Sequence, residues 1–140
     1  MQETYELSLE LCHQIAEAAR EAQKELGVSI SLAVFDRFGS LRYFYRFGDA
    51  ILPSVDISQN KAYTAAVLGK TTREFGEIAQ VGAEAFGINV THPKLVIFGG
   101  GFPLQINGIT IGGLGISGGS VEEDEAVAQK ALAAFRQATE

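Results

Sequence analysis

Residues 96–138 read VIFGGGFPLQINGITIGGLGISGGSVEEDEAVAQKALAAFRQA, and this stretch decides the fold. Within it, Asn107-Gly108 lies between two short apolar runs. The Asn-Gly pair tolerates the positive φ angles of a type I′ turn, the turn that joins neighbouring antiparallel strands. The pattern therefore predicts a β-hairpin with strands at residues 104–106 and 109–111.

A glycine-dense segment follows the hairpin and leads into a helix. Ser120 and Glu123 have the spacing of a capping box, in which each side chain binds the backbone N–H of the other residue. The helix that begins there has one apolar stripe, with residues spaced by one, three and four: Val127, Ala128, Ala131, Leu132 and Phe135. This stripe predicts that the helix packs on a sheet.

Two functional motifs match the glycine-dense segment by letter only. Gly113, Gly115 and Gly118 spell G-x-G-x-x-G, but a dinucleotide-binding turn needs a second parallel strand with an acidic residue about 20 positions later. Only the helix and a few residues follow. The letters G-x-S-x-G also occur, around Ser117, but no histidine follows to complete a hydrolase triad. We favour glycines that allow close backbone approach inside and at the end of a strand.

Composition and charge predict one globular domain over residues 1–140. Hydrophobic residues make up 46% of the chain and charged residues 20%, which suits a domain able to bury a core. The net charge is −6 and there is no basic run, so we expect neither nucleic acid nor a membrane as partner. The N-terminus lacks the pattern of a secretory signal, so we expect a cytoplasmic protein.

The N-terminal part of the chain predicts a helix followed by a hairpin. Apolar residues recur at helical spacing between Ser8, a candidate N-cap, and Gly27, a candidate C-cap. Residues 28–36 alternate as a strand with one buried face does, and residues 41–46 return as a second strand after a turn.

The middle of the chain predicts a long helix and a short one. Residues 56–68 form the long helix, which carries a small alanine face suited to close packing on a sheet. Lys61 is expected at the margin of that face. Thr71 and Glu74 have the spacing of a second capping box, which starts the short helix.

Between the short helix and the glycine hairpin, residues 82–93 are predicted to form a loop. A fifth strand is predicted over residues 95–98, followed by a triple-glycine loop made of Gly99, Gly100 and Gly101. Three consecutive glycines favour a backbone that turns sharply or approaches another group closely. Because hairpins dominate the order of elements, we predict an α+β domain with an antiparallel sheet covered by helices.

Four segments in this order resemble the GlcG/HbpS family, which includes the C-terminal domain of PduO-type proteins and proteins encoded with diol and glycerol dehydratase genes. The segments are VFDRFGSLRYFYR (34–46), SVDISQNKAYTA (54–65), FGGGFPL (98–104) and IGGLGISGGSVEEDEAVAQKAL (111–132). The resemblance covers nearly the whole chain and is strongest to the dehydratase-associated members. It implies a profilin-like, three-layer α/β/α fold with a five-stranded antiparallel sheet, and assembly into homo-oligomers.

The same resemblance implies a bound ligand but no general catalytic activity. Several members bind haem, and members associated with diol utilisation are linked to cobalamin metabolism. If haem binds here, His13 is the first candidate for the axial ligand, because it points away from the apolar stripe of its helix. His92, in the predicted loop, is the second candidate.

Three functions stay open at this point. The first is a non-catalytic accessory protein whose oligomer interface holds haem or a cobalamin-related cofactor. The second is an enzyme acting on a small anionic metabolite, bound by polar side chains and by amides of the triple-glycine loop. The third is an accessory subunit that binds proteins of a dehydratase system. Across these hypotheses the candidate ligand-binding residues are His13, Arg46, Asp56, Lys61, Gly99, Gly100 and Gly101.

Overall fold

The computed structural model describes residues 6–140 of the chain. Its helices and strands follow in the order α1 (Leu9–Leu26), β1 (Ser31–Asp36), β2 (Leu41–Arg46), α2 (Pro53–Leu68), α3 (Thr72–Ala79), α4 (Ile88–Thr91), β3 (Gly101–Ile106), β4 (Ile109–Ser117) and α5 (Val121–Thr139). This order confirms the mixed α+β class that the sequence predicts. Among the described residues, no helix combines the length and the apolar character needed to cross a bilayer.

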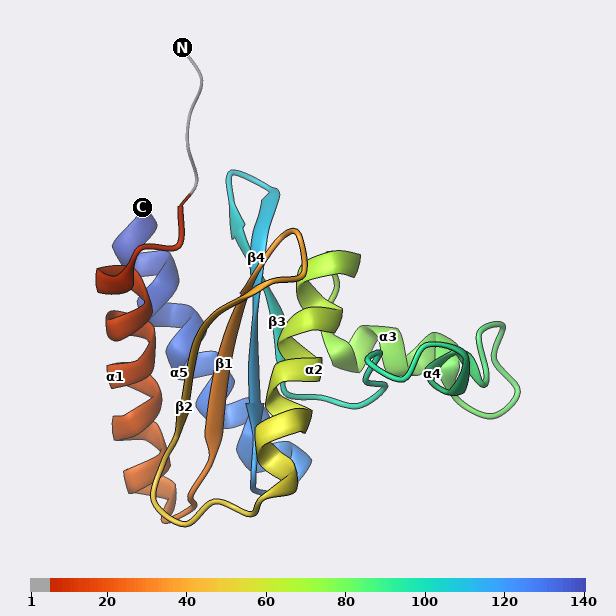
Figure 1. Ribbon diagram of the computed structural model, residues 1–140, viewed down its shortest axis with the longest axis horizontal. Coiled ribbons are helices and arrows are strands. Elements are labelled where there is room, and N and C mark those ends of the chain that lie inside the picture. Colours follow the sequence, from red (N-terminus) through yellow and green to blue (C-terminus); the bar gives the residue numbers. More distant parts are fainter. Residues whose placement is uncertain (1–5) are drawn as a thin grey trace.

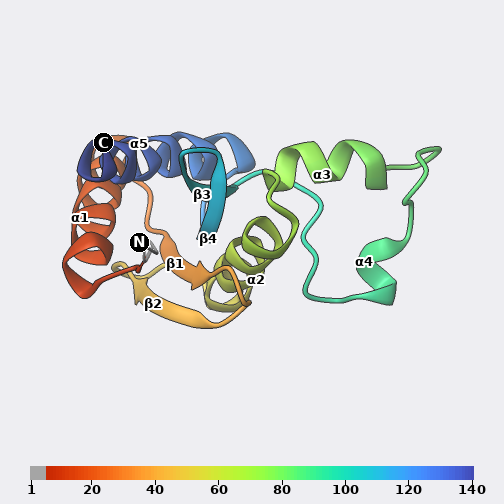
Figure 2. The ribbon, with the colours of Figure 1, turned by 90° about the horizontal axis from the view of Figure 1, so that it is seen from above.

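The four strands form one antiparallel sheet in the order β2-β1-β4-β3. Helices α1 and α5 lie on one face of the sheet and α2 lies on the other, which makes three layers (Figures 1 and 2). The larger hydrophobic core lies on the α1 and α5 side and includes Ile15, Leu32, Leu114, Ile116 and Phe135. A smaller cluster on the α2 side contains Ala33, Phe35, Ala62 and Ala66.

The prediction of a five-stranded sheet is wrong, because residues 95–98 pair with no strand. The backbone N–H of Val96 donates to Oγ1 of Thr64 in α2, at 2.9 Å. The N–H of Gly101, where β3 begins, donates to Oγ1 of Thr72 in α3, also at 2.9 Å. Leu95 and Val96 are buried, and this burial explains why the segment has the apolar pattern of a strand. Its backbone nevertheless bonds to side chains of helices and not to a neighbouring strand.

The turn and the capping box predicted for the C-terminal stretch are confirmed. Asn107 and Gly108 have φ angles of 52° and 79°, as a type I′ turn requires. Both hydrogen bonds of the capping box are present at the start of α5 and again at the start of α3. Strand β4 is longer than predicted, because it continues through the glycine-dense segment to Ser117.

The glycines of β4 bring α2 directly onto the sheet. A Cβ on Gly115 would overlap the carbonyl oxygen of Ser58 and lie 2.6 Å from the backbone nitrogen of Ala62. A Cβ on Gly113 would lie 2.6 Å from the backbone nitrogen of Ala66. Any side chain at these glycines would push the helix away, so their role is the close backbone approach that the sequence favours.

Helix α1 has the predicted ends, whereas α2 begins earlier than predicted. Ser8 caps α1, and Gly27, with φ 69°, ends it, as predicted. Helix α2 begins at Pro53, earlier than predicted, because proline is well suited to the first turn of a helix. The predicted loop at residues 82–93 contains the one-turn helix α4.

Candidate functional site

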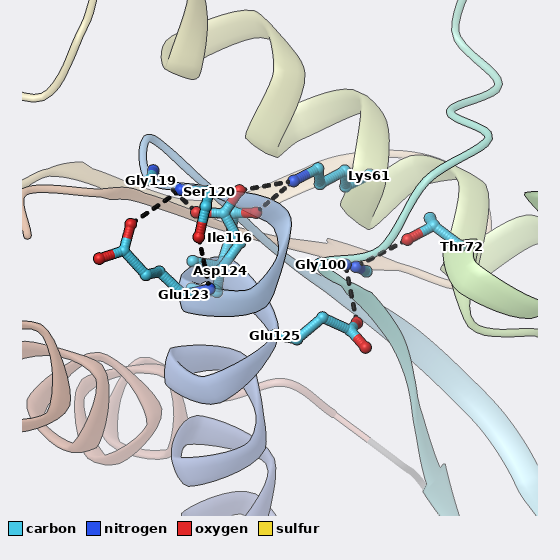
Figure 3. A network of polar contacts seen from close by, with 10 residues as sticks. Lys61, Thr72, Gly100, Ile116, Gly119, Ser120, Glu123, Asp124 and Glu125 are labelled. Atoms are coloured by element: carbon cyan, nitrogen blue, oxygen red, sulfur yellow. Dashed lines mark hydrogen bonds and ion pairs between the residues drawn. The ribbon is translucent and has the colours of Figure 1, made fainter. Parts of the chain in front are cut away.

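Lys61 lies inside the molecule and not at the margin of α2, so that part of the prediction is wrong. Its side chain is 0% exposed. The ammonium donates to the carbonyl oxygen of Ile116 in β4 at 2.8 Å and to Oδ2 of Asp124 in α5 at 3.0 Å (Figure 3). The lysine therefore joins the helix on one face of the sheet to the helix on the other face.

Asp124 is the buried partner of Lys61 and lies in the first turn of α5. Its Oδ1 accepts a hydrogen bond from the backbone N–H of Gly119 at 2.9 Å, while Oδ2 faces the ammonium. Burial raises the pKa of Asp124 and lowers the pKa of Lys61, and in each case the opposite charge of the partner counteracts the effect of burial. The geometry is that of a closed structural ion pair.

The amides of the triple-glycine loop are already bonded within the chain. The N–H of Gly100 donates to Oε2 of Glu125 at 2.8 Å (Figure 3). The N–H of Gly101 donates to Oγ1 of Thr72 at 2.9 Å. Oε1 of the same glutamate accepts from Nε of Arg73 at 2.8 Å. The loop is thus attached to α3 and α5.

Lys61 and the triple-glycine loop are brought together by the fold. A Cβ on Gly100 would lie 3.0 Å from Cδ of Lys61 and 2.7 Å from the carbonyl oxygen of Ile116. The ring of Phe98, just before the loop, lies with its centroid 5.2 Å from the ammonium, a cation–π contact. The glycine is needed so that the loop can cover the buried lysine.

Two other candidate residues lie outside the Lys61 network. Arg46 ends β2 and donates from Nε and Nη2 to the carbonyl oxygen of Ala50, at 2.8 Å and 2.6 Å. Asp56 is exposed in the first turn of α2, where a negative charge complements the helix dipole. Within residues 6–140, neither side chain forms a hydrogen bond or ion pair with Lys61 or with the triple-glycine loop.

His13 lies on the exposed face of α1. Its ring packs edge-on against Tyr43 of β2, with centroids 5.7 Å apart and an interplanar angle of 81°. Within residues 6–140 the imidazole makes no hydrogen bond. The neighbouring Cys12 is buried at 2% exposure, so the two side chains do not converge. His13 is therefore free to take a further ligand.

His92 already has a partner inside the chain. It follows α4, and its Nε2 lies 3.4 Å from the hydroxyl oxygen of Tyr63 in α2, with the ring centroids 5.7 Å apart. The ammonium of Lys94 lies 5.4 Å from the centroid of the same tyrosine ring. Binding of iron through Nε2 would break the contact with Tyr63.

Other places in the described residues give weaker candidates for a metal or cofactor. No group of three or more His, Cys, Asp and Glu side chains in residues 6–140 converges on one point. A groove of about 310 Å³ lies between α1 and α5, lined by Ala18, Glu21, Ala22, Glu25, Lys130, Ala133, Ala134 and Gln137. It contains no histidine that could serve as an axial ligand.

The sequence did not predict the hydrogen-bond partners of Lys61 and of the triple-glycine loop. By its position Asp124 belongs with the acidic residues that complement the start of α5, but it also stands three and four residues before Val127 and Ala128. That spacing places it on the buried stripe of the helix. A carboxylate in line with an apolar stripe is a signal that it needs a buried cation. Thr72 gives no comparable signal.

A sequence profile described as "Haem degrading protein HbpS-like" matches residues 7–133. The chain belongs to the HbpS-like family. This HbpS-like chain is 39% identical over 130 residues to an uncharacterized 15.0 kDa protein in the dhaT-dhaS intergenic region of Citrobacter freundii, and the match covers 92% of each protein. These findings confirm the family resemblance carried by the four segments.

Two further relatives bear the name PduO. The HbpS-like chain is 40% identical over 134 residues to the corrinoid adenosyltransferase PduO of Salmonella typhimurium, a match that covers 95% of this chain and 40% of PduO. The crystal structure of a PduOC:heme complex has a TM-score of 0.89 and 40% sequence identity, covering 93% of this chain and 95% of that one. The HbpS-like chain thus spans less than half of full-length PduO.

Proposed function

We propose that this protein binds haem as a non-catalytic accessory protein, with His13 as the axial ligand of the iron. The proposal is carried by the exposed imidazole of His13, which rests on Tyr43 and makes no hydrogen bond within residues 6–140. The description of the family and the PduOC:heme structure support haem as the ligand. When bound, haem would supply a redox-active iron.

The surroundings of His13 fit one side of a haem. A neutral imidazole is a common axial ligand, and the edge-on contact with Tyr43 limits how the ring can turn. Leu9 precedes His13 by one helical turn on the same side of α1 and is 61% exposed, so it offers apolar surface beside the imidazole. In a homo-oligomer, a second copy of the chain would cover the other side of the ligand.

The other candidate functions have less support. The enzyme hypothesis needs free amides in the triple-glycine loop, whereas Gly100 and Gly101 donate to Glu125 and Thr72. It also needs an accessible Lys61, which is fully buried. A cobalamin-related ligand and a partner from a dehydratase system stay predictions. The support for a dehydratase-system partner is limited to the position of the Citrobacter freundii relative in the dhaT-dhaS intergenic region.

Titration of the purified protein with hemin, followed by absorbance, tests the proposal. We expect a saturable shift of the Soret band at one haem per chain or per dimer. His13→Ala should weaken binding by about ten-fold or more, since it removes the bond to iron. His92→Ala is the matched control, because it removes the other of the two histidines in the chain and should leave the band unchanged.

Three results would contradict the proposal. The first is a flat hemin titration, and the second is a His13→Ala variant that keeps the wild-type spectrum and affinity while remaining folded by circular dichroism. The third is a shift seen with cob(II)alamin but not with hemin, which would identify a corrinoid as the ligand instead.

A further inference from the structure

The two outer edges of the sheet, along β3 and along β2, differ in what they offer to another strand. The N–H of Ile116 in β4 donates to the carbonyl oxygen of Gly100 at 2.9 Å, and alternate residues of an antiparallel strand face its neighbour. The backbone groups of Gly101 and Pro103 therefore face outward. The N–H of Gly101 is bonded to Thr72 and proline has no N–H, so the β3 edge offers no free donor at either residue.

Strand β2 forms the opposite edge, and Figure 2 shows no element of residues 6–140 beyond it. The N–H of Phe47 donates to the carbonyl oxygen of Ile30 at 2.9 Å, and the register of β1 with β2 fixes the alternation from there. The N–H and C=O groups of Phe44 and Arg46 accordingly face outward. The described chain provides no strand to pair with these groups, so β2 is an open edge.

The hairpin of β1 and β2 is basic, although the molecule as a whole is acidic. Residues 31–46 contain three arginines and one aspartate, a net charge of +2, whereas the whole chain has −6. The carboxylate of Asp36 accepts two backbone N–H groups of the turn and lies 3.6 Å from Arg42. Arg37 and Arg46 are exposed and pair with no carboxylate among the described residues. The open edge therefore has uncompensated positive charge beside it.

The two faces of β2 present different side chains to a strand placed beside it. Phe44 packs against the smaller cluster on the α2 side, and Arg46, two residues later, shares that side. Tyr43 packs against the larger core on the α1 side, and Tyr45, which is 51% exposed, shares that one. A strand beside β2 would meet a cation on one face and aromatic surface on the other.

We propose that the outer edge of β2 binds an extended segment of a partner protein in which acidic and apolar residues alternate. The segment pairs antiparallel with β2 through hydrogen bonds to the outward backbone groups of Phe44 and Arg46. Its carboxylates lie on the α2 side near the arginines, and its apolar side chains lie beside Tyr45. This contact uses backbone and side chains of β2 and does not depend on haem.

A second copy of β2 fits this edge less well than an acidic segment does. Two β2 strands paired antiparallel about Phe44 would bring Arg42 and Arg46 of the two copies opposite each other. Like charges that lie directly opposite destabilise a pair of strands. Charged residues on an edge strand are one way in which proteins prevent pairing between identical edges. The arginines thus select a partner of opposite charge.

Fluorescence anisotropy of the haem-free protein tests the charge requirement. The probe is a fluorescein-labelled peptide of about eight residues, within the usual length of a strand, in which glutamate alternates with valine. We expect saturable binding, and Arg42→Glu should raise the dissociation constant about five-fold or more, because repulsion replaces attraction. Arg136→Glu makes the same change of charge at an exposed position of α5 and should bind as the wild type does.

N-methylated versions of the probe test the backbone pairing. In the antiparallel pairing the glutamates lie opposite Phe44 and Arg46, so their N–H groups face β2, whereas the N–H groups of the valines face solvent. N-methylation of the glutamates should abolish binding, and N-methylation of the valines should preserve it. A contact made by charge alone would treat the two peptides alike.

Four results would overturn the proposal. The first is no binding of the unmodified probe, and the second is an Arg42→Glu variant that is folded by circular dichroism and binds as the wild type does. The third is equal binding of the two N-methylated peptides. The fourth is tighter binding of an oligothymidylate with the same number of negative charges, which would assign this edge to nucleic acid instead.

Discussion

At the scale of single residues, the ion pair of Lys61 and Asp124 joins two layers of the fold. Removing each ion from water costs several kcal/mol, and the cost is offset only by good geometry and further hydrogen bonds. Both conditions are met, because the carbonyl of Ile116 and the N–H of Gly119 complete the pair. Among the described residues, no buried side-chain nitrogen or oxygen lacks a partner.

Replacing Lys61 by methionine should lower the free energy of unfolding by about 3 to 5 kcal/mol at neutral pH, because it leaves a buried carboxylate without its cation. Loss of the cation raises the pKa of Asp124 further. An acid whose folded-state pKa is raised loses stability as the pH rises through that pKa. The deficit of the variant should therefore be smaller at pH 4 than at pH 7.

Urea denaturation of Lys61→Met at both pH values measures this effect. Lys70→Met is the matched control, because Lys70 is exposed just after α2 and its loss should change stability by no more than about 0.5 kcal/mol. Equal unfolding free energies for the two variants would show that the buried pair does not hold α2 to α5.

At the scale of elements, the packing of α2 on β4 depends on the absence of side chains along the strand. Gly113 and Gly115 bring the helix backbone into direct contact with the strand, and the alanines of α2 complete a thin layer on that side. This close approach also carries Lys61 far enough inward for its ammonium to reach α5. The buried ion pair is therefore a consequence of glycine and alanine packing.

Gly115→Ala should destabilise the protein by about 3 kcal/mol or more, because its methyl group would overlap the backbone of α2 and force the helix to move. Gly82→Ala is the control. Gly82 has φ 85° and nothing within 4 Å of the point that an added methyl group would occupy, so only left-handed backbone strain of about 1–2 kcal/mol should result. Thermal unfolding of both variants compares the two costs, and an equal loss would argue against close packing as the role of Gly115.

At the scale of the whole molecule, the chain has a layered body and a projecting segment, residues 80–94, here called the arm (Figure 1). The central strands β1 and β4 pair on both sides and lie beneath helices on both faces. The arm, by contrast, buries no side chain. Segments with few buried contacts open with little free energy, whereas central strands open only with the whole domain.

Amide hydrogen exchange should report both parts of the molecule. In dilute protein, amides of β1 and β4 should exchange last and those of residues 80–94 among the first. An arm that is as protected as β4 in dilute solution would contradict this division of the molecule.

The sequence by itself determined the local elements and the family. The Asn107-Gly108 turn, the capping boxes and the stripe of α5 are encoded by residues a few positions apart, where backbone geometry alone relates them. For the same reason helical periodicity alone places His13 on the exposed face of α1. Turn chemistry and helical periodicity need no knowledge of the rest of the chain.

Only the tertiary structure decided the number of strands, the burial of Lys61 and the occupation of the triple-glycine loop. Residues 95–98 have the apolar pattern of a strand, yet Thr64 satisfies the N–H of Val96. Lys61 and Asp124 stand 63 positions apart, and neither residue alone distinguishes a solvated charge from a paired one. Long-range contacts depend on how closely the layers approach each other. The close fit between α2 and the glycines of β4 sets this approach, and no local sequence pattern encodes it.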